Sequence, residues 1–273
     1  QLLEEATPLG ESFTIFDYEG TQQAGGDLDE LDELNEKGLD LMHNEKYEAA
    51  ISIFDEIIEK DPRYIYAYSN KGLVLDNLER YDEALEYFDK ALEIDPNYVI
   101  ALYNKGLLLN DLERYREAIP YLDRALAVEP DAIDALTEKG YSLLSLENYE
   151  DAISYFDKVL LIEPDDIDAL FYKGFSLADL GRYDEGISYY DLVLEQDPKD
   201  VVTLNNKGYA LLQLGKNDEA LVYFNKALDI DPDYELAQEN KDIALEELSG
   251  KPEEGGCLIA TATFGSELAP QVQ

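Results

Sequence analysis

The sequence predicts an all-α protein, a solenoid of six helix-turn-helix repeats followed by a capping helix. The main observation is a period of 34 residues, which two series of residues share. The glycines are Gly38, Gly72, Gly106, Gly140, Gly174 and Gly208, and the prolines are Pro62, Pro96, Pro130, Pro164, Pro198 and Pro232. Within each copy the apolar residues recur at intervals of three, four and seven, which is helical spacing. A fixed period of this length is typical of stacked repeats, so residues 31–234 are expected to share a continuous core.

Each copy is expected to form two helices. In the second copy, residues 65–98, the apolar positions are Tyr68, Leu75 and Leu78, and then Ala84, Phe88 and Ala91. Gly72 has no side chain and lets a neighbouring helix approach closely. We expect this packing to outweigh the roughly 1 kcal/mol that a mid-helix glycine costs. The turn is predicted near Tyr81, and Pro96 ends the second helix because proline cannot donate a backbone hydrogen bond.

Residues 1–30 differ from the repeats and are predicted to be an N-terminal extension. Its segment 12–18, SFTIFDY, is rich in β-branched and aromatic residues, which favours a short strand. This segment is either a loosely packed leader over the first helix or a strand that pairs with another segment. The residues expected to make the contacts are Phe13, Ile15 and Phe16.

Residues 235–249, after the sixth copy, are predicted to form the capping helix. Asp242 occupies the position of the repeat glycine there. Its side chain would prevent another repeat from docking closely, which suits the polar end of a solenoid. Gly250 and Pro252 then end the helix.

Residues 250–273 form a C-terminal tail with a different composition. Its segment 255–266, GGCLIATATFGS, has no charged residue and favours an extended strand. Because such a segment is prone to aggregation when exposed, we expect it to be docked, processed or paired with another chain. The residues expected to carry these contacts are Leu258, Ile259 and Phe264.

The charge of the chain limits its partners. The 62 acidic and 21 basic residues give a net charge of −41, which should repel nucleic acid and anionic membrane surfaces. This acidity predicts an extracellular or cell-surface protein, with a cytoplasmic one as the alternative. Divalent cations are expected to bind only without specificity, because the acidic run at 229–235 lacks the glycine and length of an EF-hand loop. No apolar run reaches the roughly 18 residues that a membrane-spanning helix needs.

No combination of residues typical of catalysis is evident. His43 is the single histidine and Cys257 the single cysteine, so a nucleophile with its base is not supported. The phosphate-binding pattern Gly-x-x-x-x-Gly-Lys-Ser/Thr is absent from the sequence. We therefore predict a non-enzymatic protein without a cofactor or a specific metal site. Cys257 is either a buried small side chain, a site of modification, or one half of an intermolecular disulfide.

The Gly, Tyr, Ala, Phe and Pro positions at this period resemble the tetratricopeptide repeat (TPR), over about three quarters of the chain. The Asn-Lys-Gly triplets at 70–72, 104–106 and 206–208 resemble a variant common in archaeal and some bacterial members. Asn217 replaces the usual turn tyrosine, and Gly186 replaces the alanine of a second helix, so a looser seam is expected there. Separately, CLIATATFG at 257–265 resembles a cysteine-containing box near the C-terminus of many archaeal exported proteins.

The TPR resemblance implies a superhelical solenoid whose first helices line a concave groove. The residues that it places there are Leu39, Tyr66, Leu73, Tyr103, Leu107, Tyr141, Phe171, Phe175 and Tyr209. These residues are either a recognition surface or part of the core between helices. The second helices already supply large core residues, which favours recognition, and these are Phe54, Phe88, Phe156, Tyr190 and Phe224.

The same resemblance makes one familiar role unlikely to apply. TPR co-chaperones hold a carboxylate with lysine, arginine and asparagine, because an anion needs charge-assisted bonds. At the matching positions this chain has Tyr103, Leu107 and Phe171, so a chaperone-tail adapter is not expected.

Three functions are compatible with these features. The first is a structural protein whose copies assemble head to tail into a filament or surface structure, through the terminal segments and the apolar groove. The alternative is a monomeric adapter whose groove binds an apolar peptide of a different protein. The third is an accessory domain for an enzyme on another chain. The expected partner is a protein, with other copies of the same chain placed first.

Overall fold

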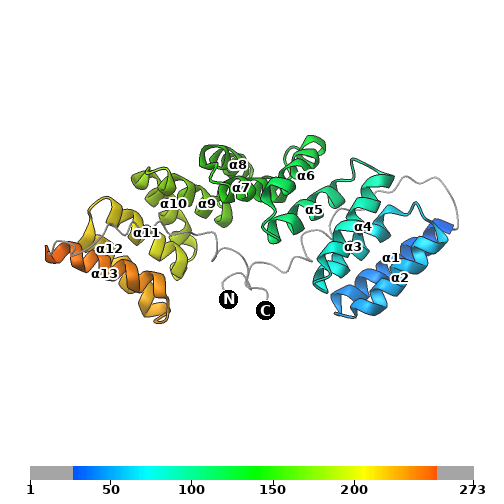
Figure 1. Ribbon diagram of the computed structural model, residues 1–273, viewed down its shortest axis with the longest axis horizontal. Coiled ribbons are helices and arrows are strands. Elements are labelled where there is room, and N and C mark those ends of the chain that lie inside the picture. Colours follow the sequence, from blue (N-terminus) through cyan, green and yellow to red (C-terminus); the bar gives the residue numbers. More distant parts are fainter. Residues whose placement is uncertain (1–26, 251–273) are drawn as a thin grey trace. The chain divides into compact units, whose positions relative to one another are not determined.

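The computed structural model describes residues 27–250 and contains only helices in that range (Figure 1). The helices are α1 (Asp27–His43), α2 (Tyr47–Lys60), α3 (Ile65–Asn77), α4 (Tyr81–Ile94), α5 (Val99–Asp111), α6 (Tyr115–Val128), α7 (Ile133–Ser145), α8 (Tyr149–Ile162), α9 (Ile167–Asp179), α10 (Tyr183–Gln196), α11 (Val201–Gln213), α12 (Asn217–Ile230) and α13 (Glu235–Ser249). We call the odd-numbered helices α1 to α11 the A helices and the even-numbered ones the B helices. The all-α repeat fold predicted from the 34-residue period is confirmed.

The described residues fall into two compact units. Unit 1 is residues 27–130, with α1 to α6, and unit 2 is residues 131–250, with α7 to α13. In each unit the two helices of a hairpin pack together, and each hairpin packs against the next one. The expectations for Phe13, Ile15, Phe16, Cys257, Leu258, Ile259 and Phe264 concern residues outside the described part of the chain.

The turn inside each hairpin requires a left-handed residue. Helix α3 ends with Glu79 at φ 58°, and its N–H donates to Asp76 O at 2.7 Å while the N–H of Arg80 donates to Leu75 O at 2.8 Å. These two bonds satisfy carbonyls that the helix end would otherwise leave open. Glutamate occupies this position in the first four repeats and glycine in the last two, at Gly181 and Gly215.

The turn between hairpins explains the recurring aspartate before each proline. Asp61 Oδ1 accepts from the N–H of Arg63 at 2.9 Å, and Asp95 accepts from Asn97 at the same distance. Asp197 and Asp231 make the equivalent bonds in unit 2. Aspartate side chains favour such turns because they bind their own backbone two residues on. Together with the proline they end each B helix and start the next hairpin.

The core is built from one large side chain of each B helix seated on the glycine of its own A helix. Phe54, Phe88, Leu122, Phe156, Tyr190 and Phe224 are at most 1% exposed. A Cβ atom added to Gly72 would lie 2.6 Å from Phe88 Cε1, and one added to Gly208 would lie 2.5 Å from Phe224 Cε1. The close approach predicted from the glycine period is therefore present, and the ring fills the space that a side chain would take.

The seam around Gly186 is closer than the sequence indicated. A Cβ atom at Gly186 would lie 2.8 Å from the carbonyl oxygen of Gly174, so α9 and α10 approach each other through two glycines. The expectation of a looser seam is wrong at this position, because the missing methyl group permits closer packing instead of leaving a gap.

We predict that Gly72→Ala destabilises the chain by about 1–3 kcal/mol, because the methyl group would overlap the Phe88 ring and force the two helices apart. Urea unfolding followed by circular dichroism measures the loss. Glu86→Ala, at an exposed site of α4, is the matched control and should change the stability by less than about 0.5 kcal/mol. Equal midpoints for the two variants would contradict the packing argument.

Candidate functional site

Each A helix of repeats two to six carries a single basic residue, the lysine before the glycine. These lysines are Lys71, Lys105, Lys139, Lys173 and Lys207. Each Nζ lies 4.3–4.4 Å from the ring centroid of a tyrosine on the B helix of the same repeat. The tyrosines are Tyr87, Tyr121, Tyr155, Tyr189 and Tyr223. The lysines therefore point toward the B helices.

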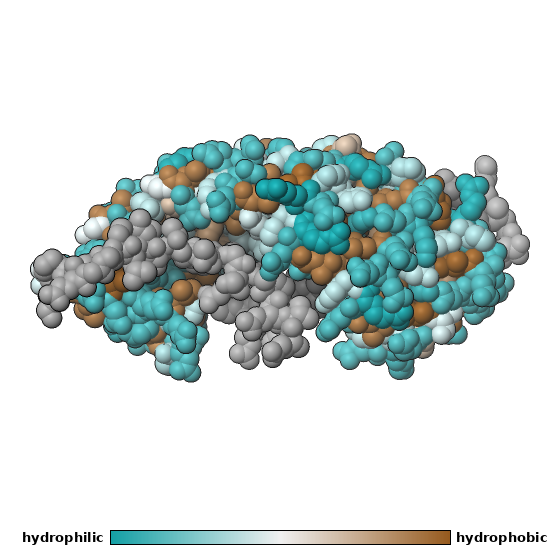
Figure 2. Space-filling view, viewed as in Figure 1, coloured by the Kyte–Doolittle hydropathy of each residue, from teal (hydrophilic) through white to brown (hydrophobic). Residues whose placement is uncertain are grey.

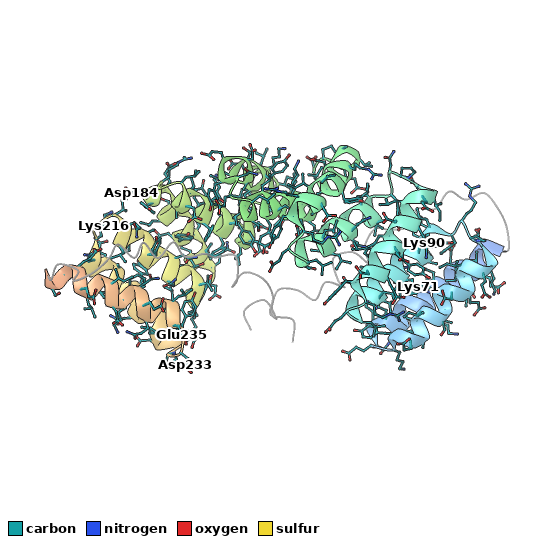
Figure 3. The ribbon with its side chains drawn as sticks, viewed as in Figure 1. Lys71, Lys90, Asp184, Lys216, Asp233 and Glu235 are labelled. Carbon is teal, nitrogen blue, oxygen red and sulfur yellow. The ribbon has the colours of Figure 1, made fainter. Side chains whose placement is uncertain are left out.

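Four of these lysines also link successive repeats. They form ion pairs with an aspartate on the B helix of the preceding repeat, and the pairs are Lys71–Asp55, Lys105–Asp89, Lys173–Asp157 and Lys207–Asp191. Burial lowers the pKa of Lys71, but its hydrogen bonds to Asp55 and Tyr87 outweigh this effect, so the pKa is raised. Lys90 lies on the other side of the Tyr87 ring system at 4.0 Å from its centroid (Figure 3).

The rest of each of these A helices has no cation to offer. The carboxylates on them include Asp76 and Asp111 in unit 1 and Asp134 and Asp168 in unit 2. Among the ion pairs of residues 27–250, none joins a lysine or arginine to any of these four. The lysines are thus used on one side of the repeats, while the carboxylates of the A helices remain without a countercharge.

Asp76 and Asp111 are neighbours in unit 1. Burial, and then the charge of Asp111, raise the pKa of Asp76 to about 7. Burial raises the pKa of Asp111 to about 6, although its side chain is still partly open to solvent. Tyr81, the first residue of α4, lies near both, since their charges contribute to its raised pKa after burial and Glu79. A nearby cation would favour ionisation of both carboxylates.

The structure places the predicted groove residues in two classes. Leu39, Tyr66, Leu73, Leu107, Tyr141, Phe171 and Tyr209 are partly buried. Tyr103 and Phe175 are only 6% and 5% exposed, so nearly all of their surface is used in packing. The leucines at the repeat interval, Leu39, Leu73 and Leu107, therefore lie at the boundary between core and solvent in unit 1.

The aromatic residues of the A helices also contact one another. In unit 1 the Tyr66 ring packs edge to face on Tyr64 at 5.4 Å and on Tyr98 at 5.9 Å. In unit 2 Phe171 lies 5.5 Å from Tyr172 and 6.2 Å from Tyr190. Sequence analysis missed Tyr98 and Tyr172. Tyr172 stands where other repeats carry the asparagine of Asn-Lys-Gly, and this substitution was a usable signal.

Asparagines on the A helices form a second feature that sequence analysis missed. Asn70 Nδ2 donates to Asn35 Oδ1 at 2.8 Å, and Asn240 Nδ2 donates to Asn205 Oδ1 at 3.0 Å. At the equivalent position of the third repeat, Asn104 is only 4% exposed and its Nδ2 has no hydrogen-bond acceptor. Buried amide groups normally have a partner, so this donor is available to an incoming group.

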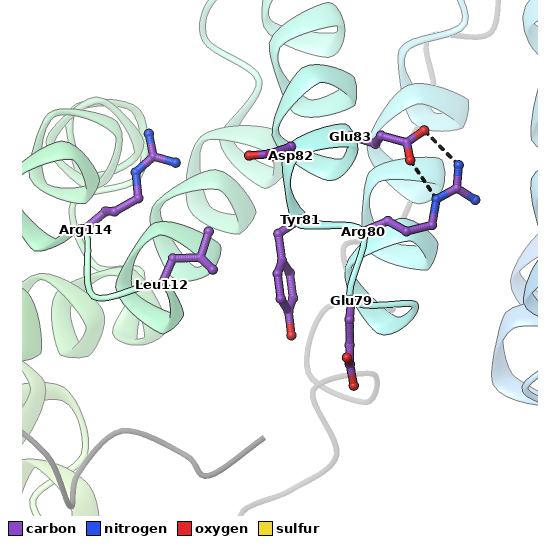
Figure 4. A pocket seen from close by; sticks show the side chains of 7 residues that line it. All are labelled: Glu79, Arg80, Tyr81, Asp82, Glu83, Leu112 and Arg114. Atoms are coloured by element: carbon purple, nitrogen blue, oxygen red, sulfur yellow. Dashed lines mark hydrogen bonds and ion pairs between the residues drawn. The ribbon is translucent and has the colours of Figure 1, made fainter. Parts of the chain in front are cut away.

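An open pocket of about 540 Å³ lies beside the hairpin turn of the second repeat (Figure 4). Tyr81, Leu112 and the Arg80–Glu83 pair line it, together with Glu79, Asp82 and Arg114. Arg80 donates to both carboxylate oxygens of Glu83 at 2.7–2.8 Å, and Arg114 binds Glu117 in the same way. Because each arginine is already paired with a carboxylate, the pocket is not suited to an anion.

Other kinds of site find little support in residues 27–250. No group of three or more His, Cys, Asp or Glu residues in that range is placed to hold a metal ion. No helix in the same range is long and apolar enough to cross a membrane. On the face shown in Figure 2 apolar side chains form small areas between hydrophilic ones.

Comparison with family models finds the tetratricopeptide repeat. One model matches residues 65–98 and 201–234, and another matches 103–167 and 137–201. These matches together span more than half of the chain. Comparison with curated proteins finds no match.

Solved structures agree with this family. YrrB, described as a TPR protein with an unusual peptide-binding site, is 31% identical with a TM-score of 0.63, and the match covers 69% of this chain and 97% of YrrB. PilF of Pseudomonas aeruginosa is 22% identical with a TM-score of 0.69, covering 79% of this chain and 98% of PilF. MamA of Desulfovibrio magneticus RS-1 is 22% identical with a TM-score of 0.60, covering 62% and 96%. The last two comparisons show the fold alone.

We predict a coupling free energy of about 1 kcal/mol between Lys105 and Asp89, because the lysine is buried and charge-assisted bonds are stronger away from water. A double-mutant cycle with Lys105→Met and Asp89→Asn, measured by urea unfolding, gives this value. The exposed Arg80–Glu83 pair within one helix turn is the control and should show weaker coupling. Coupling no larger than in this control would show that the buried lysine does not join the repeats.

Proposed function

The chain belongs to the tetratricopeptide repeat family, and from this premise we propose that it is a non-catalytic scaffold that binds a segment of a partner protein. The proposed binding surface is the solvent-facing side of the A helices. The observation that carries this proposal is the separation of the two sides of the repeats. Lysine and tyrosine pairs join the B-helix side together, whereas the A-helix side keeps partly exposed leucine and aromatic residues.

Helix pairs that are packed in this way suit the binding of a peptide. The glycine and aromatic contacts hold each A helix in place before the partner arrives, so little conformational entropy is lost on binding. Leu73 and Leu107, on consecutive A helices of unit 1, still expose part of their surface for an apolar side chain. YrrB is similar in sequence and is described as having a peptide-binding site, which supports the same general role here.

A random dodecapeptide library displayed on phage tests this proposal against the immobilised full chain. We predict that peptides are enriched and that Leu73→Asn with Leu107→Asn weakens their binding about tenfold, because apolar contact area is lost. The matched control is Leu192→Asn with Val222→Asn, which changes two exposed apolar residues of B helices. This control should bind as the unaltered chain does. Absence of any enriched peptide, or equal binding by both double variants, would contradict the proposal.

The composition of the tail favours a second candidate function. An uncharged, strand-favouring segment at 255–266 in a chain with a net charge of −41 suits pairing with another copy. On this proposal copies associate head to tail through the segments that contain Phe13, Ile15, Leu258 and Phe264, at the cell surface or outside the cell. These segments lie outside the described residues, so the support comes from the sequence.

Deleting residues 255–273 tests this second candidate. We predict that the full chain forms large assemblies and that the deletion converts them to small particles, because the uncharged segment supplies the contact between copies. Light scattering measures the particle size. Replacing Leu258, Ile259 and Phe264 by serine in the full-length chain is the matched control for chain length and should have the same effect. Assemblies that persist unchanged after the deletion would exclude this route.

A further inference from the structure

We propose that the A-helix side of unit 1 selects partner segments in which a lysine or arginine adjoins a large apolar residue, and that Asp76 and Asp111 bind the cation. This inference rests on the proposed scaffold function and adds the chemistry of the partner. The carboxylate pair, the leucines between the repeats and the unpaired amide of Asn104 together define the site.

The spacing of these residues puts them on one side of their helices. Leu73 and Asp76 are three residues apart on α3. Asn104, Leu107 and Asp111 are three, four and seven residues apart on α5, which packs next to α3. Residues at these intervals share one face of a helix. A single partner segment therefore meets apolar surface at the leucines and negative charge at the aspartates.

The two carboxylates lack the donors that their counterparts have. In unit 2, Tyr149 donates to Asp179, and Asn217 Nδ2 donates to Glu247 Oε2 at 2.8 Å. Asp111 occupies the equivalent position in unit 1, but no hydrogen bond from Tyr81 or ion pair to it is found among the described residues. Lys71 and Lys105 are the only cations on α3 and α5, and both are bound to aspartates of B helices.

The paired arrangement occurs at one place in the described repeats. At the same two positions of the other neighbouring A-type helices within a unit, at most one member is acidic. The pairs are Met42 and Asn77 in unit 1, and Leu144 and Asp179, Ala178 and Gln213, and Leu212 and Glu247 in unit 2. Asp76 and Asp111 are therefore a local feature, not a consequence of the general acidity of the chain.

A basic side chain satisfies this site better than the alternatives. The two carboxylates repel each other, and a lysine or arginine between them would remove this repulsion and add charge-assisted bonds. The buried Nδ2 of Asn104 then donates to a backbone carbonyl of the same segment. The pocket beside Tyr81 and Leu112 adjoins the pair and leaves room for the side chain that carries the charge (Figure 4). An acidic segment would be repelled.

The test uses the phage library with the full chain and two double variants. Asp76→Asn with Asp111→Asn removes the site, and Glu86→Gln with Glu93→Gln removes the same charge from exposed sites of α4. We expect the enriched peptides to contain lysine or arginine beside a large apolar residue. When these peptides are synthesised, fluorescence anisotropy at physiological salt should show at least a roughly tenfold loss for the aspartate variant and less than about a twofold loss for the glutamate variant.

Two further measurements make the outcome specific. Replacing the peptide lysine by norleucine should weaken binding to the unaltered chain and leave binding to the aspartate variant unchanged. Asp111→Lys should prefer the same peptide with glutamate in place of lysine. Thermal unfolding checks that each variant is folded.

The results that overturn this inference differ from those that overturn the scaffold. Enriched peptides without a basic residue, or equal losses in the two double variants, would exclude the aspartate site and leave peptide binding intact. Binding of Ca²⁺ alone that the aspartate variant abolishes would assign the pair to a metal ion instead. A library that yields no peptide at all would contradict the scaffold function itself.

Discussion

The contact between a B-helix ring and an A-helix glycine is the constraint on which the other features depend. Because a Cβ atom at Gly72 would lie 2.6 Å from Phe88, the two helices of the hairpin can reach this separation only without a side chain there. Repetition of the contact every 34 residues places each A helix at the same depth over its B helix. The lysine before each glycine is consequently delivered to the same place, under a tyrosine of the B helix.

The lysines show how a very acidic chain uses its few cations. Of 21 basic residues, five are committed to the position before the glycine, where they connect one repeat to the next or to a tyrosine. Their stems are buried, so they serve as packing groups as well as charges. The cost is paid on the A-helix side, where Asp76 and Asp111 have no countercharge and their pKa values rise.

This distribution links stability to recognition. Features that stabilise the stack face the B helices, while unsatisfied charge and partly exposed apolar surface remain on the A helices. A chain with a net charge of −41 has a long-range attraction for basic segments, but such attraction alone is screened at physiological salt. Selectivity therefore needs local sites in which a charge and an apolar contact occur together, as around Leu73 and Asp76.

The sequence by itself determined the repeat, the helices and the core, because glycine, proline and apolar spacing act locally and recur at a visible period. It also indicated Leu73 and Leu107 as surface positions. Only the tertiary structure decided where the lysines point, that Tyr103 and Phe175 are buried, and that Gly186 tightens its seam. It also decided that Asp76 meets Asp111, since these residues are 35 apart and their proximity depends on how one hairpin packs on the next. Such relations between repeats leave no local signal in a single sequence.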